Sequence, residues 1–195
     1  MSENPWKLVQ KNLIHTNKFG YKVYNDDVIT PKNKPGTYFY IDHFGYSFVV
    51  ALTQDMKVAM VRQWRYPTDT EFLELPAGGL DENEDPLAAA KRELKEETGG
   101  ESEKWVKLSE YWLADGVAKI KGYLYLALDT SFGKNHFDPT EKMQLEFLDF
   151  GEAVSGVLDG RFDDERTQMG LLFADKYLTS VSLPAAPTLP ISEQH

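Results

Sequence analysis

Apolar and polar positions alternate over short stretches in the first half of the chain. The segment KLVQKNLIHTNKFGYKVYNDDVIT, residues 7–30, has a pattern that predicts two or three strands. Residues 37–53 predict a strand, a turn and a second strand, and residues 56–66 predict another. We therefore expect an antiparallel β-rich extension over residues 1–45, followed by the strands of a main sheet.

The spacing of apolar residues changes to that of a helix after residue 85. Leu87, Ala90 and Leu94 recur at helical intervals. Asp85 is a suitable N-cap, and the proline after it occupies the first helical position, where its missing N–H costs nothing. Two glycines, residues 99 and 100, provide a left-handed C-terminal stop. The pattern predicts one helix from about residue 86 to residue 98.

Strand and helix patterns alternate again in the second half. Residues 105–114, 119–129 and 143–150 alternate like strands, residues 151–160 predict a short helix, and residues 163–178 predict an amphipathic helix. This order fits an α/β protein in which a mixed sheet is flanked by helices. We expect a main domain over residues 46–180 and an extended tail over residues 181–195.

Composition narrows the possible functions. The chain has 195 residues, a formal net charge of −10 and a pI near 4.9, which disfavours binding to nucleic acid polymers and acidic membranes. It has no cysteine and four scattered histidines, so we expect neither a thiolate site nor a histidine-rich metal site. The start, MSENPWK, lacks the apolar core of a signal peptide, and no stretch approaches the ~20 apolar residues of a membrane span. A cytoplasmic protein is expected.

Carboxylates crowd the end of the predicted helix. Glu93 and Glu97 are four residues apart and share a face, with Glu96 beside them. Like charges at this spacing repel, and the negative end of the helix dipole adds to the repulsion. A hard divalent cation such as Mg²⁺ would relieve it. An ordinary solvated helix with Glu/Lys pairs is the alternative interpretation.

The residues around the helix decide between these two interpretations. They fit the frame G-x5-E-x7-R-E-U-x-E-E-x-G, in which U is aliphatic: Gly78, Glu84, Arg92, Glu93, Leu94, Glu96, Glu97 and Gly99. This frame resembles the Nudix box of the Nudix hydrolases. The position after Gly99 is usually aliphatic in that box and is Gly100 here. We expect this glycine to loosen the packing behind the helix.

The resemblance implies a fold, a cofactor and a set of residue roles. It implies a Nudix α/β/α sandwich that uses Mg²⁺, with Mn²⁺ as a possible substitute. Glu93 and Glu97 are the implied principal metal ligands, with Glu96 beside them and the carbonyl of Ala77 as a further ligand. Arg92 is implied to orient the glutamates and to pair with Glu84. Which glutamate is the general base stays open.

The flanking residues suggest a branch of the family. VRQWRYP before LELPAGG resembles the ADP-ribose pyrophosphatases, which hydrolyse nucleoside diphosphate sugars. Arg65 would then hold the substrate diphosphate, or form an ordinary surface salt bridge. Glu74 would anchor substrate or be a packed, paired carboxylate. Glu141, in the loop after the box, would ligate metal or activate water, or simply cap the next strand.

Two further features concern the substrate. No proline occurs between Pro86 and Pro139, where ADP-ribose-preferring members commonly carry one, so we expect a broad preference that includes ADP-ribose and GDP-mannose. In this branch the N-terminal strands commonly cross to a partner subunit and help to hold the nucleobase. We therefore expect a homodimer in which Trp6 contacts the base. Other aromatic candidates for stacking on a base are Phe19, Tyr21 and Trp112.

Other functions fit the same motif. A Nudix hydrolase could act on a dinucleoside polyphosphate, an oxidised nucleotide or an RNA cap, although the acidic chain lacks the basic stripe expected for RNA. A non-catalytic module could bind ADP-ribose as a sensor, but such modules generally lose box glutamates, and all are present here. An acidic structural domain would require the eight-position match to be accidental.

Overall fold

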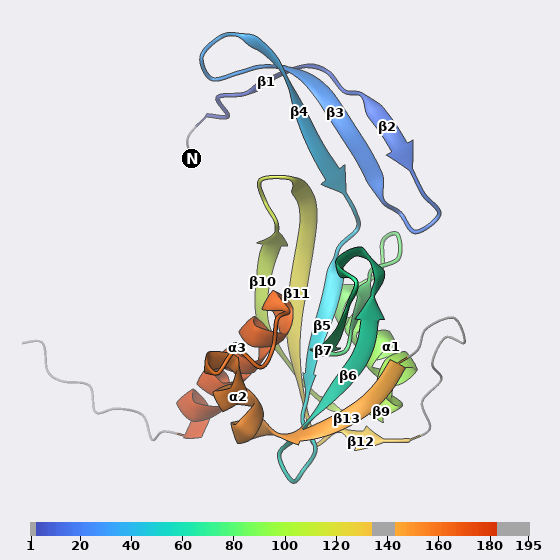
Figure 1. Cartoon of the computed structure of the whole chain (residues 1–195), viewed down its shortest axis with the longest axis vertical. Helices are drawn as coiled ribbons and strands as arrows, with labels where there is room; N and C mark the ends of the chain where they lie inside the picture. The colour runs from blue at the N-terminus through green and yellow to red at the C-terminus, as the bar shows by residue number, and fades with distance from the viewer. Residues whose placement is uncertain (1–2, 134–142, 183–195) are drawn as a thin grey trace, which may run out of the picture.

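A computed structural model describes residues 3–133 and 143–182 (Figure 1). Within these ranges the helices are α1 (Pro86–Thr98), α2 (Phe150–Leu158) and α3 (Glu165–Ser182), with a 3-10 turn at Tyr66–Thr68. The strands are β1 (Lys7–Gln10), β2 (Leu13–Thr16), β3 (Lys22–Ile29), β4 (Pro35–Asp42), β5 (Tyr46–Ala51), β6 (Lys57–Arg65), β7 (Thr70–Glu74), β8 (Ala77–Gly79), β9 (Gly100–Glu101), β10 (Lys104–Leu113), β11 (Ala118–Leu128), β12 (Ser131–Phe132) and β13 (Met143–Asp149).

The central strands bury both of their faces. Alternate residues of β5, such as Phe48 and Val50, pack into one core with α2 and α3, whereas Val49 and Ala51 pack into a second core with α1. Strands β6 and β11 divide their side chains between the same two cores. Helices therefore cover both faces of the strands, and the predicted α/β/α sandwich is confirmed.

The main sheet is mixed, as predicted. Strand β11 pairs in parallel with β5 and β4 and antiparallel with β10, and β8 pairs antiparallel with β5. A separate sheet has the order β13-β6-β7, with antiparallel pairs throughout. This second sheet carries β6 and β7 alongside the loop at β8, so residues 63–79 converge on one region of the molecule.

The N-terminal strands form an antiparallel extension that projects from the rest of the molecule (Figure 1). Strands β1 and β2 pair with successive parts of β3, and β3 pairs along its length with β4. A short parallel pairing, Ala118 with Ile41 and Lys119 with Asp42, joins β4 to β11. The extension is thus continuous with the main sheet, and its β2–β3 turn faces the body of the protein.

Helix α1 begins and ends where the sequence predicts. The Asp85 side chain accepts hydrogen bonds from the N–H groups of Leu87 and Ala88, each at 3.0 Å. Gly99 ends the helix in the left-handed region, with φ of 68°. These two local signals fix where the helix starts and stops, and with it which faces its glutamates occupy.

The expectation for Gly100 is wrong. A Cβ at this position would lie 2.8 Å from Thr98 Oγ1, 2.9 Å from Phe132 Cε1 and 3.0 Å from Leu94 Cγ. The packing behind the helix is tight, because the Phe132 ring fills the space that an aliphatic residue would occupy. Gly100 leaves room for the Phe132 ring because it has no side chain of its own.

The predicted C-terminal boundary also changes. Helix α3 continues through Ser182, two residues beyond the expected end of the main domain, and the rest of the predicted tail lies outside the described residues. In the described part of the chain, no helix combines the length and the apolar character needed to cross a bilayer.

Candidate active site

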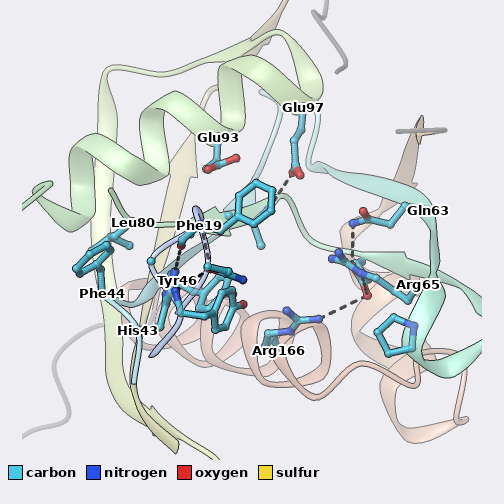
Figure 2. Close-up of a pocket in the computed structure, with 18 of the residues that line it drawn as sticks. Phe19, His43, Phe44, Tyr46, Gln63, Arg65, Leu80, Glu93, Glu97 and Arg166 are labelled. Atoms are coloured by element: carbon cyan, nitrogen blue, oxygen red, sulfur yellow. Dashed lines mark hydrogen bonds and ion pairs between the residues drawn. The ribbon is translucent and has the colours of Figure 1, made fainter. Parts of the chain in front are cut away.

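One cavity of about 1220 Å³ lies where the box loop, α1, β6, β7, the start of α3 and the β2–β3 turn meet. Its volume exceeds the roughly 300–1,000 Å³ of a typical ligand site, so it has room for an elongated ligand. In Figure 2, Glu93 and Glu97 point into the cavity from α1, and Arg166 points into it from α3. Aromatic side chains, among them Phe19 and Tyr46, line another side. The lining residues lie within 16–22, 43–46, 63–82 and 163–166, together with Glu93, Glu97 and Met143.

Of the three glutamates on the box helix, Glu93 and Glu97 line this cavity. The Glu93 side chain is 12% exposed and lies against the box loop, so that a Cβ at Gly78 would fall 2.0 Å from its carboxyl carbon. Glu97 Oε2 accepts a hydrogen bond from the N–H of Ala77 at 3.0 Å. Glu96 is 56% exposed and is not part of the lining. Helical spacing places Glu93 and Glu97 together and turns Glu96 toward the rim.

Arg92 holds the box together, as its predicted role requires. Its Nε and Nη2 donate to the two Glu84 oxygens at 3.0 and 2.9 Å, which confirms that pairing. Nη2 also donates to the Gly79 carbonyl at 3.0 Å, and Nη1 donates to Glu93 at 2.6 Å. These hydrogen bonds lower the pKa of Glu84, whereas burial raises the pKa of Glu93 against the opposing charge of Arg92.

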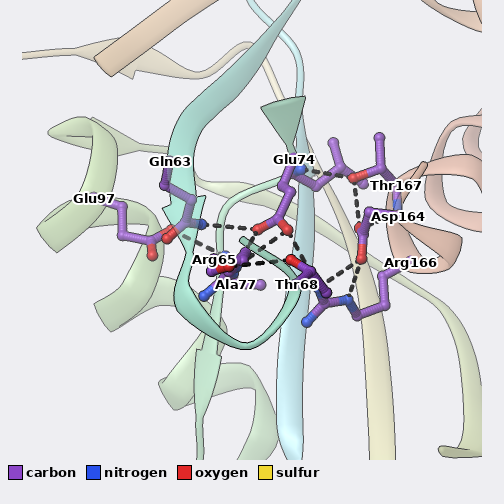
Figure 3. A network of polar contacts seen from close by, with 10 residues as sticks. Gln63, Arg65, Thr68, Glu74, Ala77, Glu97, Asp164, Arg166 and Thr167 are labelled. Carbon is purple, nitrogen blue, oxygen red and sulfur yellow. Dashed lines mark hydrogen bonds and ion pairs between the residues drawn. The ribbon is translucent and has the colours of Figure 1, made fainter. Parts of the chain in front are cut away.

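A second ion-pair network forms another wall of the cavity (Figure 3). Glu74 is only 3% exposed and accepts hydrogen bonds from Gln63 Nε2 at 2.8 Å and from Arg65 Nε at 3.1 and 3.2 Å. Arg166 Nη2 lies 3.5 Å from Glu74 Oε1, and Arg166 Nε donates to Asp164 at 2.7 Å. One buried carboxylate thus holds two arginines at the cavity.

This network clarifies both alternatives that the sequence left open. Arg65 forms a salt bridge, but it also lines the cavity, so the two interpretations are compatible. Glu74 is the packed, paired carboxylate, because its oxygens are already occupied by Gln63 and two arginines. Its contribution to substrate binding would be to position Arg65 and Arg166.

Sequence reasoning missed Arg166. Burial alone would lower its pKa, but the attraction of Asp164 and Glu74 outweighs that effect, so its pKa is raised and its charge is secure. The available signal was its place in DDERT at the start of an amphipathic helix. Nothing local shows that this turn of α3 docks beside β7, where Thr167 Oγ1 accepts the N–H of Leu75 at 3.0 Å.

The aromatic candidates separate into two groups. Phe19 and Tyr21, on the β2–β3 turn, line the cavity, whereas Trp6 and Trp112 do not. Trp6 packs edge-on against Tyr38, with ring centroids 5.2 Å apart. Within one chain the predicted base contact of Trp6 is therefore not formed, because β1 pairs with the far end of β3. Contact across a subunit boundary stays a prediction.

Glu141 lies outside the described residues, so its role stays a prediction. For the metal, no three His, Asp or Glu side chains within residues 3–133 and 143–182 already converge as a metal-binding group. The donor chemistry nevertheless fits a divalent cation, since Glu93 and Glu97 present carboxylate oxygens to the same cavity. The space over Gly78, which any Cβ would fill, lets the Glu93 carboxylate reach that position.

Comparison with known proteins assigns the family. Residues 43–169, well over half of the chain, match the NUDIX domain. This chain belongs to the Nudix family. The Nudix box predicted from residues 78–99 lies inside the matched range and forms the β8–α1 edge of the cavity.

Relatives of this Nudix protein include several with named activities. It is 33% identical over 154 residues to a methanol dehydrogenase activator of Bacillus methanolicus, covering 78% of this chain and 83% of that protein. It is 31% identical over 153 residues to an ADP-ribose pyrophosphatase of Bacillus subtilis (strain 168), covering 78% and 79%. It is 32% identical over 139 residues to a GDP-mannose pyrophosphatase of Yersinia pestis (strain Pestoides F), covering 67% and 70%.

A solved structure agrees on the fold. The crystal structure of an ADP compounds hydrolase superposes with a TM-score of 0.79 at 18% identity, covering 93% of this Nudix chain and 98% of that one. At this identity the likeness concerns the fold. The superposed length includes more of the chain than the NUDIX domain match, which starts at residue 43.

Proposed function

We propose that this Nudix pyrophosphohydrolase cleaves the diphosphate bond of nucleoside diphosphate sugars, ADP-ribose and GDP-mannose among them. The products are a nucleoside monophosphate and a sugar phosphate. The observation that carries the proposal is one cavity that joins the carboxylates Glu93 and Glu97 to the guanidinium groups of Arg65 and Arg166. Relatives named for ADP-ribose and GDP-mannose hydrolysis support the substrate class.

The sides of the cavity carry different types of side chain. In Figure 2, Glu93 and Glu97 lie on one side, and the arginines Arg65 and Arg166 and the aromatic residues around Phe19 lie on others. A diphosphate sugar has matching parts: an anionic centre, which cations bind, and a planar base, which aromatic rings can stack on. The cavity thus fits an elongated molecule with a phosphate group between two different ends.

The proposed division of labour follows the contacts. Glu93, Glu97 and the Ala77 carbonyl would hold divalent cations, Mg²⁺ foremost with Mn²⁺ as a substitute, and Glu96 would act from the rim. Bound cations supply charge to the phosphate oxygens and lower the pKa of water. Arg92 keeps Glu93 in place through its hydrogen bond at 2.6 Å.

The remaining residues would act on the substrate. Arg65 and Arg166, both fixed by Glu74, would bind the diphosphate by charge-assisted hydrogen bonds. Phe19 and Tyr21 would contact the nucleoside end. A carboxylate, either one of the box or Glu141, would accept the proton of the attacking water. No protein nucleophile is required.

A substrate panel tests the proposal directly. With Mg²⁺, the protein should hydrolyse ADP-ribose, GDP-mannose and a UDP-sugar with kcat/KM values within about two orders of magnitude, because a pocket that reads shape seldom discriminates more than ~200-fold per missing group. Mass spectrometry of the products identifies the cleaved bond. EDTA should abolish turnover, and Mg²⁺ should restore it.

Three outcomes would contradict the proposal. Turnover that persists in EDTA would remove the metal from the reaction. Tight ADP-ribose binding without any hydrolysis would favour the sensor alternative. A ten-thousand-fold preference for one substrate, or activity only on a dinucleoside polyphosphate or oxidised nucleotide, would overturn the broad sugar-nucleotide assignment.

We also propose a homodimer formed through the N-terminal extension, residues 1–45. Strands β1 and β2 are exposed along their whole length, with apolar side chains that include Leu8, Val9, Leu13 and Ile14 at 55–64% exposure. A second copy would cover them, and twofold pairing is the commonest arrangement. It would also bring Trp6 toward a neighbouring chain.

Light scattering tests the dimer. The intact protein should have twice the 22.2 kDa chain mass at micromolar concentration. Ile14→Glu should shift it toward monomer, because a carboxylate would be buried in the interface. Leu158→Glu, on an apolar residue of α2 that is still more exposed (85% against 59% for Ile14), is the control and should stay dimeric. A wild-type monomer, or an unchanged Ile14→Glu mass, would contradict the proposed interface.

A further inference from the structure

His43 is a buried side chain between β4 and β5, with 8% exposure, and it lines the cavity. The Gly45 N–H donates to its Nδ1 at 3.2 Å. Because Nδ1 accepts, the neutral ring carries its proton on Nε2. Nε2 lies 3.0 Å from the carbonyl oxygen of Phe19, which can only accept, so His43 donates to the β2–β3 turn.

The His43 ring also lies against two tyrosines and close to the box loop. It packs at a tilt against Tyr21 and stacks on Tyr46, with centroid distances of 4.4 and 5.0 Å. A Cβ at Gly79 would lie only 3.2 Å from its Cε1. Gly79 is the box glycine whose carbonyl accepts from Arg92. One imidazole therefore hydrogen-bonds to the N-terminal turn, as Figure 2 shows, and lies close to the box loop at Gly79.

The turn that His43 holds has few contacts of its own. Residues 17–21 are closed by local bonds at Asn17: its Oδ1 accepts the N–H groups of Phe19 and Tyr21 at 3.0 and 3.1 Å, its N–H donates to the Tyr21 carbonyl at 3.1 Å, and its carbonyl accepts the Gly20 N–H at 3.4 Å. Phe19 itself is 66% exposed. An exposed turn with such local bonds opens readily unless something fastens it to the body. Gly20 packs against Phe44, and the bond from His43 Nε2 adds a directional attachment.

We infer that His43 is a positioning residue: by fastening residues 17–21 to the box loop, it sets the affinity for the nucleoside half of the substrate. This inference rests on the proposed function. His43 acts through the turn, and the distance between the aromatic side and the metal side of the cavity is fixed through its ring. Loss of the hydrogen bond between His43 and Phe19 weakens nucleoside binding and leaves the hydrolytic step nearly unchanged.

The test compares His43→Phe with His43→Gln. Phenylalanine keeps a ring for stacking and loses both hydrogen bonds, whereas glutamine can still donate from a nitrogen at a similar reach. In His43→Phe, KM for ADP-ribose and the inhibition constant of AMP should rise about tenfold, the size expected for one ordered hydrogen bond. kcat and the inhibition constant of ribose 5-phosphate should change less than threefold. His43→Gln should recover most of the AMP affinity.

A second variant approaches the turn from its other side. Asn17→Ala removes the two side-chain bonds across the turn without changing His43 and keeps the backbone bonds, and Asn17 is exposed, so folding is not at risk. It should show the same selective loss of AMP affinity. Combined with His43→Phe it should add little, because both changes release one element. This variant keeps the inference testable if His43→Phe fails to fold.

Hydrogen exchange measured without nucleotide separates this inference from the proposed function. Amides of residues 18–21 should exchange at least threefold faster in His43→Phe than in wild type, with those of α1 unchanged. This result stands even if no sugar nucleotide is hydrolysed. Unchanged exchange in the turn, or equal weakening of AMP and ribose 5-phosphate together with a fall in kcat, would overturn the positioning role.

Discussion

Glu97→Gln should lower kcat by about 100- to 1,000-fold, the loss typical of removing one group that stabilises the transition state electrostatically. Glu97 lies on the last turn of α1 and lines the cavity beside Glu93. Glutamine has the same shape, and its carbonyl oxygen can still accept the Ala77 N–H, so the loop should stay in place. What disappears is the negative charge. Steady-state kinetics with saturating Mg²⁺ and a thermal melt measure the two effects separately.

Glu101→Gln is the matched control for this change. It removes one carboxylate near the same helix end, but its partner is the exposed Lys95 and neither residue lines the cavity. Its kcat should stay within about twofold of wild type. Full activity in Glu97→Gln would remove this glutamate from the mechanism, and an equal loss in both variants would show that only the overall charge matters.

The sequence predicts α1 almost completely because its signals are local. Asp85 caps the start, Gly99 stops the end, and helical spacing alone puts Glu93 and Glu97 on one face. Arg92 finds Glu84 eight residues away, within the same loop and helix. The strand patterns likewise predict the two-sided sheet, since residues that alternate along β5 separate into two cores.

The opposite walls of the cavity could not be predicted this way. Arg166 reaches Glu74 from a helix far along the chain, and His43 binds Phe19 across 24 residues of sequence. Both contacts depend on how separate elements dock. Gly100 shows the same limit, because its tight packing comes from Phe132, a neighbour that the motif does not specify. Local patterns therefore locate the metal side, and tertiary packing assembles the substrate side.

Gly78 offers a way to move one metal-side carboxylate without deleting it. An added Cβ would sit 2.0 Å from the Glu93 carboxyl carbon and from its Oε1, and 2.3 Å from its Oε2. Two such atoms cannot share that space, so one must shift. The Glu93 carboxylate is the end of a flexible side chain, whereas Gly78 belongs to β8, which is paired with β5. The side chain should therefore yield, and the backbone should stay.

Gly78→Ala should consequently lower kcat by about 100-fold, since a displacement of roughly 1 Å at a reacting centre can cost that much. The melting temperature should fall by only a few degrees, because the side chain yields rather than the strand. Gly116→Ala, at a glycine with open space around it, is the control and should leave both quantities unchanged. Kinetics across a Mg²⁺ titration measure the effect, which should include weaker apparent metal affinity. Wild-type turnover in Gly78→Ala would show that the position of Glu93 is unimportant, and a collapse in stability would show that the strand moved instead of the carboxylate.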